Sequence, residues 1–430
     1  MKKPFTVLYF IWSALILSYA APAQEPGGSG SNPFAQAKFV PDISLVMDAS
    51  YTLRNHRDAV YQSLILPGFS SVTAERPALD HSGVNNRQGF NFNYAELVVS
   101  SVVDPYFDLF VVCDFGEDTF GIEEAYFTTR RLAWGLQLKG GKFLSHFGRL
   151  NSQHSHQWDF ADAPMVYAAF FGESLLNEKG VRLTWVAPFD TYCMFGGEFL
   201  QGENPMSFGR SGFSDPSGAA IVKESDGPDL AVAYIKTSYD WETLTLLGGL
   251  SYASGMTRLN QGLELGAPLS QADYGRTHVA GIDLTIKYLF DSIRYLTAQA
   301  EYLSRSRQGN HYHWAGEEGV VIQRWKSRQA GFYGQLVGRF TKRVRAGLRY
   351  DLLHSNGVEW DHVRQSYPER LPRLSAMVEY NPTEFSRLRI QYNHDTSRYE
   401  PRAGRYVRKP VHELALQINL AIGAHGAHAF

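Results

Sequence analysis

The sequence has few cysteines and almost no excess charge, and these two shortages exclude several classes of protein. Only 2 of its 430 residues are cysteine, too few for a disulfide-stapled fold or a cysteine-rich metal site. The formal net charge at pH 7 is -2, whereas a nucleic-acid-binding chain needs a strongly basic face. Nucleic acid is therefore not an expected partner.

The sequence also lacks an apolar run long enough for a membrane helix. The longest run, Phe5 to Tyr19, falls short of the roughly 20 residues that a spanning helix needs. Two lysines precede it and the small residues of Ala21-Pro22-Ala23 follow it. This pattern predicts a secretory signal peptide over residues 1–23, with an uncleaved membrane anchor as the alternative. Residues 24–39, rich in Gly, Ser and Pro, predict a flexible periplasmic leader.

From Pro41 onward, apolar and polar residues alternate with a period of two over segments of strand length. In the last such segment, the large apolar residues from Leu414 to Ile422 alternate with polar or small ones. Successive side chains of a strand point to opposite faces, so each segment predicts a strand with one apolar and one polar face.

The connections between these segments alternate between short polar turns and long loops, which is typical of outer-membrane β-barrels. The long loops are expected near 54–87, 145–178, 202–228, 255–275, 307–326 and 355–370. The sixteen predicted strands cover 40–53, 88–102, 106–115, 120–130, 135–144, 179–187, 191–201, 229–239, 242–254, 276–289, 294–306, 327–340, 343–354, 371–380, 385–397 and 409–422. The prediction is an all-β fold, a transmembrane antiparallel barrel over 40–430. Barrels of 14 or 18 strands and a soluble β-sandwich remain alternatives.

Aromatic residues, 14% of the chain, gather near the predicted strand ends, where barrels carry aromatic girdles at the membrane–water boundary. The terminal Phe430 has the parity of Leu420 and Ile422 and is the kind of residue that the barrel-insertion machinery recognises. These features predict a location in the outer membrane of a Gram-negative cell, in contact with its lipid.

Several motifs carry a resemblance to a known family. They are Val103–Tyr106, Glu123–Tyr126, Gly141–Phe143, Phe147–Asn151, His154, Phe170–Glu173, Asn177–Gly180, Trp185–Pro188, Gly202–Asn204 and Gly423–Phe430. In these stretches the chain resembles the zinc-regulated, receptor-like outer-membrane proteins, which are distantly similar to phosphate-selective porins. The resemblance implies an outer-membrane barrel and no particular substrate. A plugged receptor has about 22 strands, and the segment between Gln24 and Val40 is too short for a plug, so a passive pore is the better interpretation.

The parity of the strands predicts which charged residues face the lumen. The expected acidic wall contains Glu96, Asp108, Asp114 and Glu124. The expected basic wall contains Gln335, Arg339, Arg345, Arg349, Arg387, Arg389 and Gln391. Opposite charges across a constriction set up a transverse field that biases ions, and Arg345, Arg349, Arg387 and Arg389 would then form an anion-attracting ladder. Alternatively, these charges pair with each other and select nothing.

The long loop over 145–178 is expected to fold inward and narrow the pore. It carries His154, His156, Asp159 and Asp162. Imidazole and carboxylate groups suit zinc, so His154, His156 and Asp159 form a candidate metal site. The alternative is an ordinary solvated loop.

No nucleophile motif such as G-x-S-x-G is present, so an enzyme is not expected, nor is a cofactor. Cys113 and Cys193 lie on strands that are not neighbours and are expected to stay unpaired. The sequence thus favours a channel for passive diffusion of small hydrophilic solutes or ions, with a homo-oligomer as one arrangement. A receptor or zinc-uptake barrel without a plug remains the alternative.

Overall fold

The computed structural model describes residues 41–69, 85–172, 174–215, 218–261, 271–315, 319–402 and 405–423. The chain divides into two units, Met1–Val40 and Pro41–Phe430, and only the second is described below. The expected signal peptide (1–23), leader (24–39) and terminal Phe430 lie outside the described residues, so they stay predictions.

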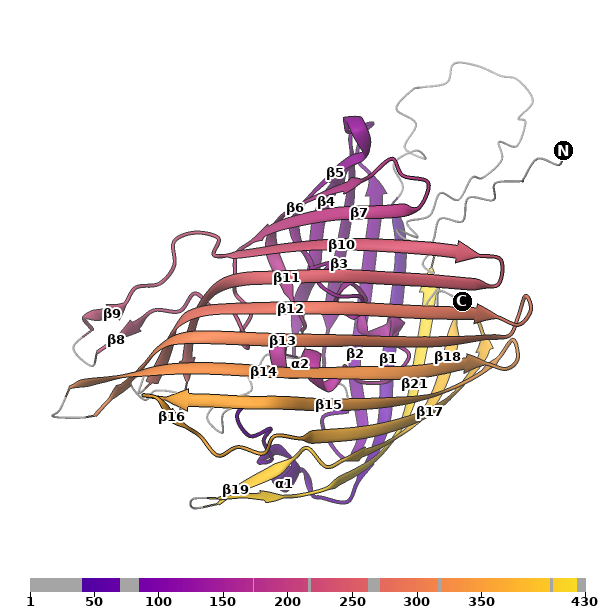
Figure 1. Ribbon diagram of the computed structural model, residues 1–430. Helices are drawn as coiled ribbons and strands as arrows, with labels where there is room; N and C mark the ends of the chain where they lie inside the picture. Colours follow the sequence, from indigo (N-terminus) through magenta and orange to yellow (C-terminus); the bar gives the residue numbers. More distant parts are fainter. Residues whose placement is uncertain are drawn as a thin grey trace, which may run out of the picture. The chain divides into compact units, whose positions relative to one another are not determined.

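Sixteen strands form a closed antiparallel barrel, and the two-residue strand β16 (Val363–Arg364) pairs with β15 in the same sheet (Figure 1). The first eight are β1 (Asp42–Arg54), β2 (Gly89–Val102), β3 (Phe107–Phe115), β4 (Phe120–Thr129), β5 (Leu136–Leu144), β6 (Asn177–Val186), β7 (Tyr192–Leu200) and β10 (Leu230–Trp241). The other eight are β11 (Leu244–Gln261), β12 (Gln271–Leu289), β13 (Tyr295–Trp314), β14 (Val320–Arg339), β15 (Val344–Trp360), β17 (Leu371–Thr383), β18 (Ser386–Asp395) and β21 (Val411–Gly423). Each strand pairs with its neighbour in this order.

The sheet closes on itself because β1 pairs with β21. The pairing runs from Ser44 opposite Gly423 to Arg54 opposite Glu413. Closure leaves the barrel without an open edge and lets the backbone groups of its strands bond to one another, which a structure surrounded by lipid requires. The predicted fold, a barrel of sixteen strands, is confirmed.

The exposed and buried faces of the strands are reversed relative to a soluble protein. On β21, Ile422 is 67% exposed whereas Asn419 is fully buried, and the same alternation runs along the strand. Large apolar residues therefore cover the outside and polar residues face the interior, as the parity predicted. This is the pattern of a barrel that is dissolved in lipid.

Each connection at one rim of the barrel carries an exposed aromatic residue. The connections follow β2, β4, β6, β10, β12, β14 and β17, and their aromatic residues are Tyr106, Trp134, Phe189, Trp241 at the last position of its strand, Phe290, Phe340 and Phe385. Rings of this kind sit at the boundary between lipid and water. We call this rim of the barrel the short-turn end.

At the opposite rim, five strands are longer than predicted. The sequence placed loops over 255–275 and 307–326, but β11 continues to Gln261, β12 starts at Gln271, and β13 and β14 extend to leave only a short connection. Similarly, β15 continues to Trp360. Strands that project beyond the lipid have water on their outer face, so the apolar alternation that reveals a strand disappears there while the hydrogen bonding continues.

The remaining elements lie in the connections. They are α1 (Asp58–Gln62), η2 (Ala133–Gly135), η3 (Leu150–Ser152), η4 (Ser155–Gln157), α2 (Met165–Phe171), β8 (Phe213–Ser214), β9 (Ala220–Val222), β16 (Val363–Arg364), β19 (Tyr399–Arg402) and β20 (Arg405–Arg408). Within the described ranges, none of the helices has the length and apolarity needed to cross a membrane. Cys113 and Cys193 are both free, as expected.

The outward face predicts how a charge would be tolerated. Leu284 on β12 is 48% exposed. Because the strand is tilted, it lies at a depth of about 12 Å from the short-turn end, near the middle of an apolar band that is about 25 Å thick. We expect Leu284→Arg to lower the free energy of unfolding by about 2–4 kcal/mol in lipid vesicles. The matched change Phe290→Arg at the interface should cost about 0–1 kcal/mol. Equal losses in denaturant titrations of the two variants would contradict the assignment of the lipid face.

Candidate functional site

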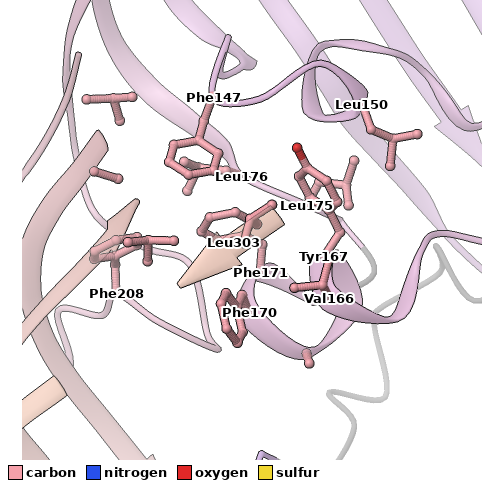
Figure 2. Packing of buried hydrophobic residues seen from close by; sticks show 14 of the residues in the cluster. Phe147, Leu150, Val166, Tyr167, Phe170, Phe171, Leu175, Leu176, Phe208 and Leu303 are labelled. Atoms are coloured by element: carbon pink, nitrogen blue, oxygen red, sulfur yellow. The ribbon is translucent and has the colours of Figure 1, made fainter. Parts of the chain in front are cut away.

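The connection between β5 and β6, residues 145–176, folds into the barrel. We call it the inner loop. Its helix α2 is buried on all sides, with Val166, Phe170 and Phe171 inaccessible to solvent. The ring of Phe171 packs edge-on against Phe147, with centroids 5.3 Å apart, in a cluster that also contains Val166, Phe170 and Leu303 of β13 (Figure 2). A helix that is apolar on all sides must be enclosed by protein. The structure therefore agrees with the prediction that this loop folds inward.

Glu301 on β13 holds the start of the inner loop. Its carboxylate accepts hydrogen bonds from the hydroxyls of Tyr167 and Tyr333, both at 2.6 Å. It also accepts bonds from the backbone N–H groups of Arg149 and Leu150, both at 2.9 Å. Four donors on one buried carboxylate stabilise its charge and satisfy backbone groups that the loop itself leaves unpaired.

Gly148 permits this arrangement. Its φ is +63°, and a Cβ at this position would collide with the Tyr167 hydroxyl and the Glu301 carboxylate. Only glycine therefore combines the left-handed backbone with the close approach of the two side chains.

Other wall residues hold the rest of the inner loop in the same way. Glu198 on β7 accepts from the Ser145 hydroxyl at 2.5 Å and from the His146 N–H at 3.0 Å. Asp351 on β15 accepts from the N–H of Met165, the first residue of α2, at 2.8 Å. A carboxylate at a helix N-terminus satisfies a free N–H group and favours the helix dipole.

The acidic residues of the inner loop bind the arginines of the basic wall. Asp162 bonds Arg349 at 2.9 Å and Arg373 at 2.6 Å. Asp159 pairs with Arg345 and also accepts from Gln335 at 2.9 Å. The structure therefore does not bring Asp159, a predicted metal ligand, to the donor group of His154, because its carboxylate neutralises an arginine of the basic wall.

The deeper arginines are paired as well. Glu379 bonds Arg389 at 2.8 Å and Arg345 at 3.1 Å, and it lies 3.9 Å from Arg387. Arg349, Arg387 and Arg389 are each at most 3% exposed. These arginines face the interior, as predicted, but carboxylates and the inner loop cover them, so an anion-attracting ladder is a poor description of this set.

A less covered basic group lies nearer the short-turn end. Lys287 and Arg339 both lie over the ring of Tyr295, at 4.5 and 5.9 Å from its centroid. Both side chains are only partly buried. Lys287 also interacts electrostatically with Arg345 and Arg149. Of the predicted lumen arginines, Arg339 and Arg345 belong to this group. Lys287 has lumen-facing parity but was not among the predicted wall residues.

The histidines of the inner loop contact the acidic wall. His154 Nε2 lies 2.9 Å from Glu124 of β4, and its Nδ1 lies 3.0 Å from Glu123. His156 Nδ1 lies 3.1 Å from Glu96 of β2. Burial would lower the pKa of His154, but the surrounding carboxylates of Glu123 and Glu96 outweigh burial and raise it well above its usual value.

Glu123 is the member of this cluster that parity could not reveal. Adjacent residues of a regular strand point to opposite faces, so Glu124 inward implies Glu123 outward. The register between β3 and β4 shifts at this point, where Val112 faces Glu124 but Cys113 faces Ile122. This bulge accommodates both carboxylates beside His154. The sequence did contain one signal for Glu123: a carboxylate at a position whose parity would face lipid.

The other two predicted acidic residues occupy different places. Asp114 lies opposite Glu96 in the pairing of β2 with β3, close enough to interact electrostatically with His154. Asp108 lies near the short-turn end, half exposed, at 3.6 Å from Arg130. Asp114 therefore belongs to the acidic wall beside the inner loop, whereas Asp108 belongs to the rim.

Removing the Glu301 carboxylate should release the inner loop. We expect Glu301→Ala to leave four donors without their acceptor, at a cost of about 3 kcal/mol or more, and to speed chymotrypsin cleavage within residues 145–176 at least tenfold. Glu359→Ala, an exposed carboxylate on β15, is the matched control. Unchanged cleavage in Glu301→Ala would show that this carboxylate does not hold the loop.

Acid should weaken the contact between Asp162 and the basic wall. Burial raises the pKa of Asp162, but Arg349 and Arg373 outweigh it and lower this pKa to about 2. Because its pKa is lowered, the ionised carboxylate stabilises the docked loop at pH values above about 3.8, the ordinary pKa of aspartate. This stabilisation of about 2 kcal/mol is lost as the pH falls through 2. We expect pepsin to cleave the inner loop faster at pH 2 than at pH 4. Asp162→Asn should already be cleaved fast at pH 4, and a wild-type-like pH dependence in this variant would exclude Asp162 as the cause.

Comparison with known proteins places the fold. No protein-family model matches the chain. The outer membrane channel DcaP of Acinetobacter baumannii superposes with a TM-score of 0.51 at 12% identity, covering 90% of this chain and 99% of that one. An anion-selective porin from Comamonas acidovorans gives a TM-score of 0.52 at 11% identity, covering 89% of this chain and all of the porin. At such low identity these matches establish the fold, which is that of the outer-membrane porins.

A relative by sequence comes from Aquifex aeolicus (strain VF5), where it is described as an uncharacterized protein. It is 43% identical over 399 residues, which are 93% of this chain and 82% of the relative. Identity at this level over nearly the whole barrel means that both chains share their architecture. The chain therefore belongs to the same family as this Aquifex aeolicus protein.

Proposed function

We propose that the chain is a passive channel of the cell outer membrane for small hydrophilic solutes or ions. The observation that carries this proposal is a closed barrel with a polar interior, in which the inner loop reaches both the acidic and the basic wall. A loop fixed in this way narrows the lumen at a defined place. Selectivity then depends on the charges that remain accessible beside it.

A group of partly buried basic residues lies near the short-turn end, beside the inner loop. Lys287, Arg339 and Arg345 lie together around Tyr295, and Arg345 bonds Asp159 and Glu379. Partly buried cations with low-dielectric surroundings attract anions more strongly than exposed ones. A preference for anions is the expected result.

A second candidate function is metal uptake by a barrel without a plug. The resemblance to zinc-regulated, receptor-like proteins suggests it, and the cluster of Glu96, Glu123 and His154 favours it. A homo-oligomer and recognition of Phe430 by the insertion machinery stay predictions. Catalysis has no support in the motifs of the sequence.

Reversal potentials test the channel and its selectivity together. In planar bilayers with asymmetric KCl, we expect stepwise currents from the wild type and an anion preference. Lys287→Glu combined with Arg339→Glu should lower the anion-to-cation permeability ratio at least threefold, because two accessible cations become anions.

The matched control is Arg131→Glu, a charge reversal at an exposed residue of a short connection, which should leave the ratio unchanged. If the wild type inserts and folds but passes no current, the protein is not a channel, and a receptor with a blocked lumen is the better interpretation. An unaltered reversal potential in the double variant would remove the basic group from the selectivity mechanism.

A further inference from the structure

Three donor atoms converge where the inner loop meets β2 and β4. One carboxylate oxygen each of Glu96 and Glu123 and a ring nitrogen of His154 lie within 4.8 Å of one another. His154 Nδ1 is 3.0 Å from Glu123 Oε2 and 3.7 Å from Glu96 Oε2. Around a tetrahedral metal ion with bonds near 2.0–2.2 Å, neighbouring donors lie about 3.4 Å apart. The two measured distances fall on either side of this value.

The imidazole of His154 is already oriented for such a site. Its second nitrogen, Nε2, lies 2.9 Å from Glu124 Oε2. When Nε2–H donates to this carboxylate, the lone pair of Nδ1 points toward Glu96 and Glu123. A carboxylate behind the imidazole fixes the tautomer and strengthens the ligand in most histidine metal sites.

His156, from the same loop, contacts the cluster through Glu96. Its Nδ1 lies 3.1 Å from Glu96 Oε2, and both side chains are 2% exposed. The rings of His154 and His156 stack with centroids 5.7 Å apart, so both histidines approach Glu96 from the loop side. One imidazole and two carboxylates make a mixed nitrogen and oxygen set, with room left for a water or solute ligand.

Charge and access also favour a cation. Glu96, Glu123 and Glu124 surround one imidazole, so their negative charge exceeds that of a simple ion pair even when His154 is protonated. Glu123 keeps 25% of its side chain exposed and His154 keeps 11%. The carboxylate of Glu123 therefore leaves an approach from the lumen to an otherwise buried donor set.

We infer that Glu96, Glu123 and His154 bind one divalent transition-metal ion, with Glu124 as the residue that positions His154, and with His156 in contact with Glu96. Imidazole together with carboxylate suits Zn²⁺ and similar ions, whereas Ca²⁺ and Mg²⁺ take mainly oxygen ligands. The ion joins the inner loop to β2 and β4. This site involves Glu96 and Glu123 of the wall, in place of Asp159.

Calorimetry of the full-length protein in detergent tests the site with Zn²⁺ and Ca²⁺ as probes. We expect one Zn²⁺ per chain, bound at least 100-fold more tightly than Ca²⁺. Glu123→Gln and His154→Ala should each weaken Zn²⁺ binding at least 100-fold, and Glu124→Gln should weaken it about 10–100-fold, as expected for a residue that only positions a ligand. Co²⁺ in place of Zn²⁺ should give the visible absorption of a tetrahedral site, which Glu123→Gln should abolish.

Two variants serve as matched controls. His311→Ala with His313→Ala removes the other His-x-His pair, where His311 bonds Asp273 at 2.8 Å, and Asp159→Asn removes the carboxylate expected from sequence. Both should bind Zn²⁺ like the wild type. Circular dichroism of every variant should show an intact barrel, and Glu123→Gln is the least disruptive change because Glu123 is partly exposed.

The inference is overturned if the wild type binds no Zn²⁺, or if folded Glu123→Gln and His154→Ala bind it as tightly as the wild type. Metal binding is measured in detergent without any ion current. The result therefore stands apart from the channel function, and a metal-binding protein without conductance would retain the site while excluding the passive channel.

Discussion

Charge pairing between the barrel wall and the inner loop is the interaction on which the interior depends. A buried charge without a partner costs several kcal/mol, and the inward faces of the strands carry many. The loop meets this demand with opposite charges on opposite sides: Asp159 and Asp162 reach arginines, whereas His154 reaches glutamates. The order of charges along the loop therefore matches the order of charges around the wall.

A second constraint comes from the backbone of the inner loop. Irregular backbone inside a barrel at membrane depth must find partners within the protein. Here wall side chains supply them, with Glu301, Glu198 and Asp351 accepting from loop N–H groups. Carboxylates that parity marks as lumen charges are thus partly structural. Because these carboxylates bind N–H groups of the inner loop, fewer of them are accessible to a passing ion.

Sequence alone predicted the strands within the lipid and their parity, because an apolar outer face leaves a period-two pattern. It missed what lacks such a pattern: the extensions of β11 to β15 beyond the lipid, and Glu123, which a bulge brings beside His154. The partner of Asp159 was also beyond reach, since the choice between His154 and Arg345 depends on how the loop crosses the lumen. The sequence indicated which charged residues line the interior, but only the folded structure shows which of them pair with each other.

The crossing itself ties the two walls together. Glu124 lies on β4 and Arg349 on β15, seven strands apart around a ring of sixteen, so the contacts of His154 and Asp162 lie almost diametrically opposite. Only eight residue steps separate His154 from Asp162, with a maximum reach of about 28 Å. The short segment between these two residues therefore connects the two walls. The inner loop is held from both sides of the lumen, by His154 at the acidic wall and by Asp162 at the basic wall, and this double attachment fixes where the loop narrows the barrel.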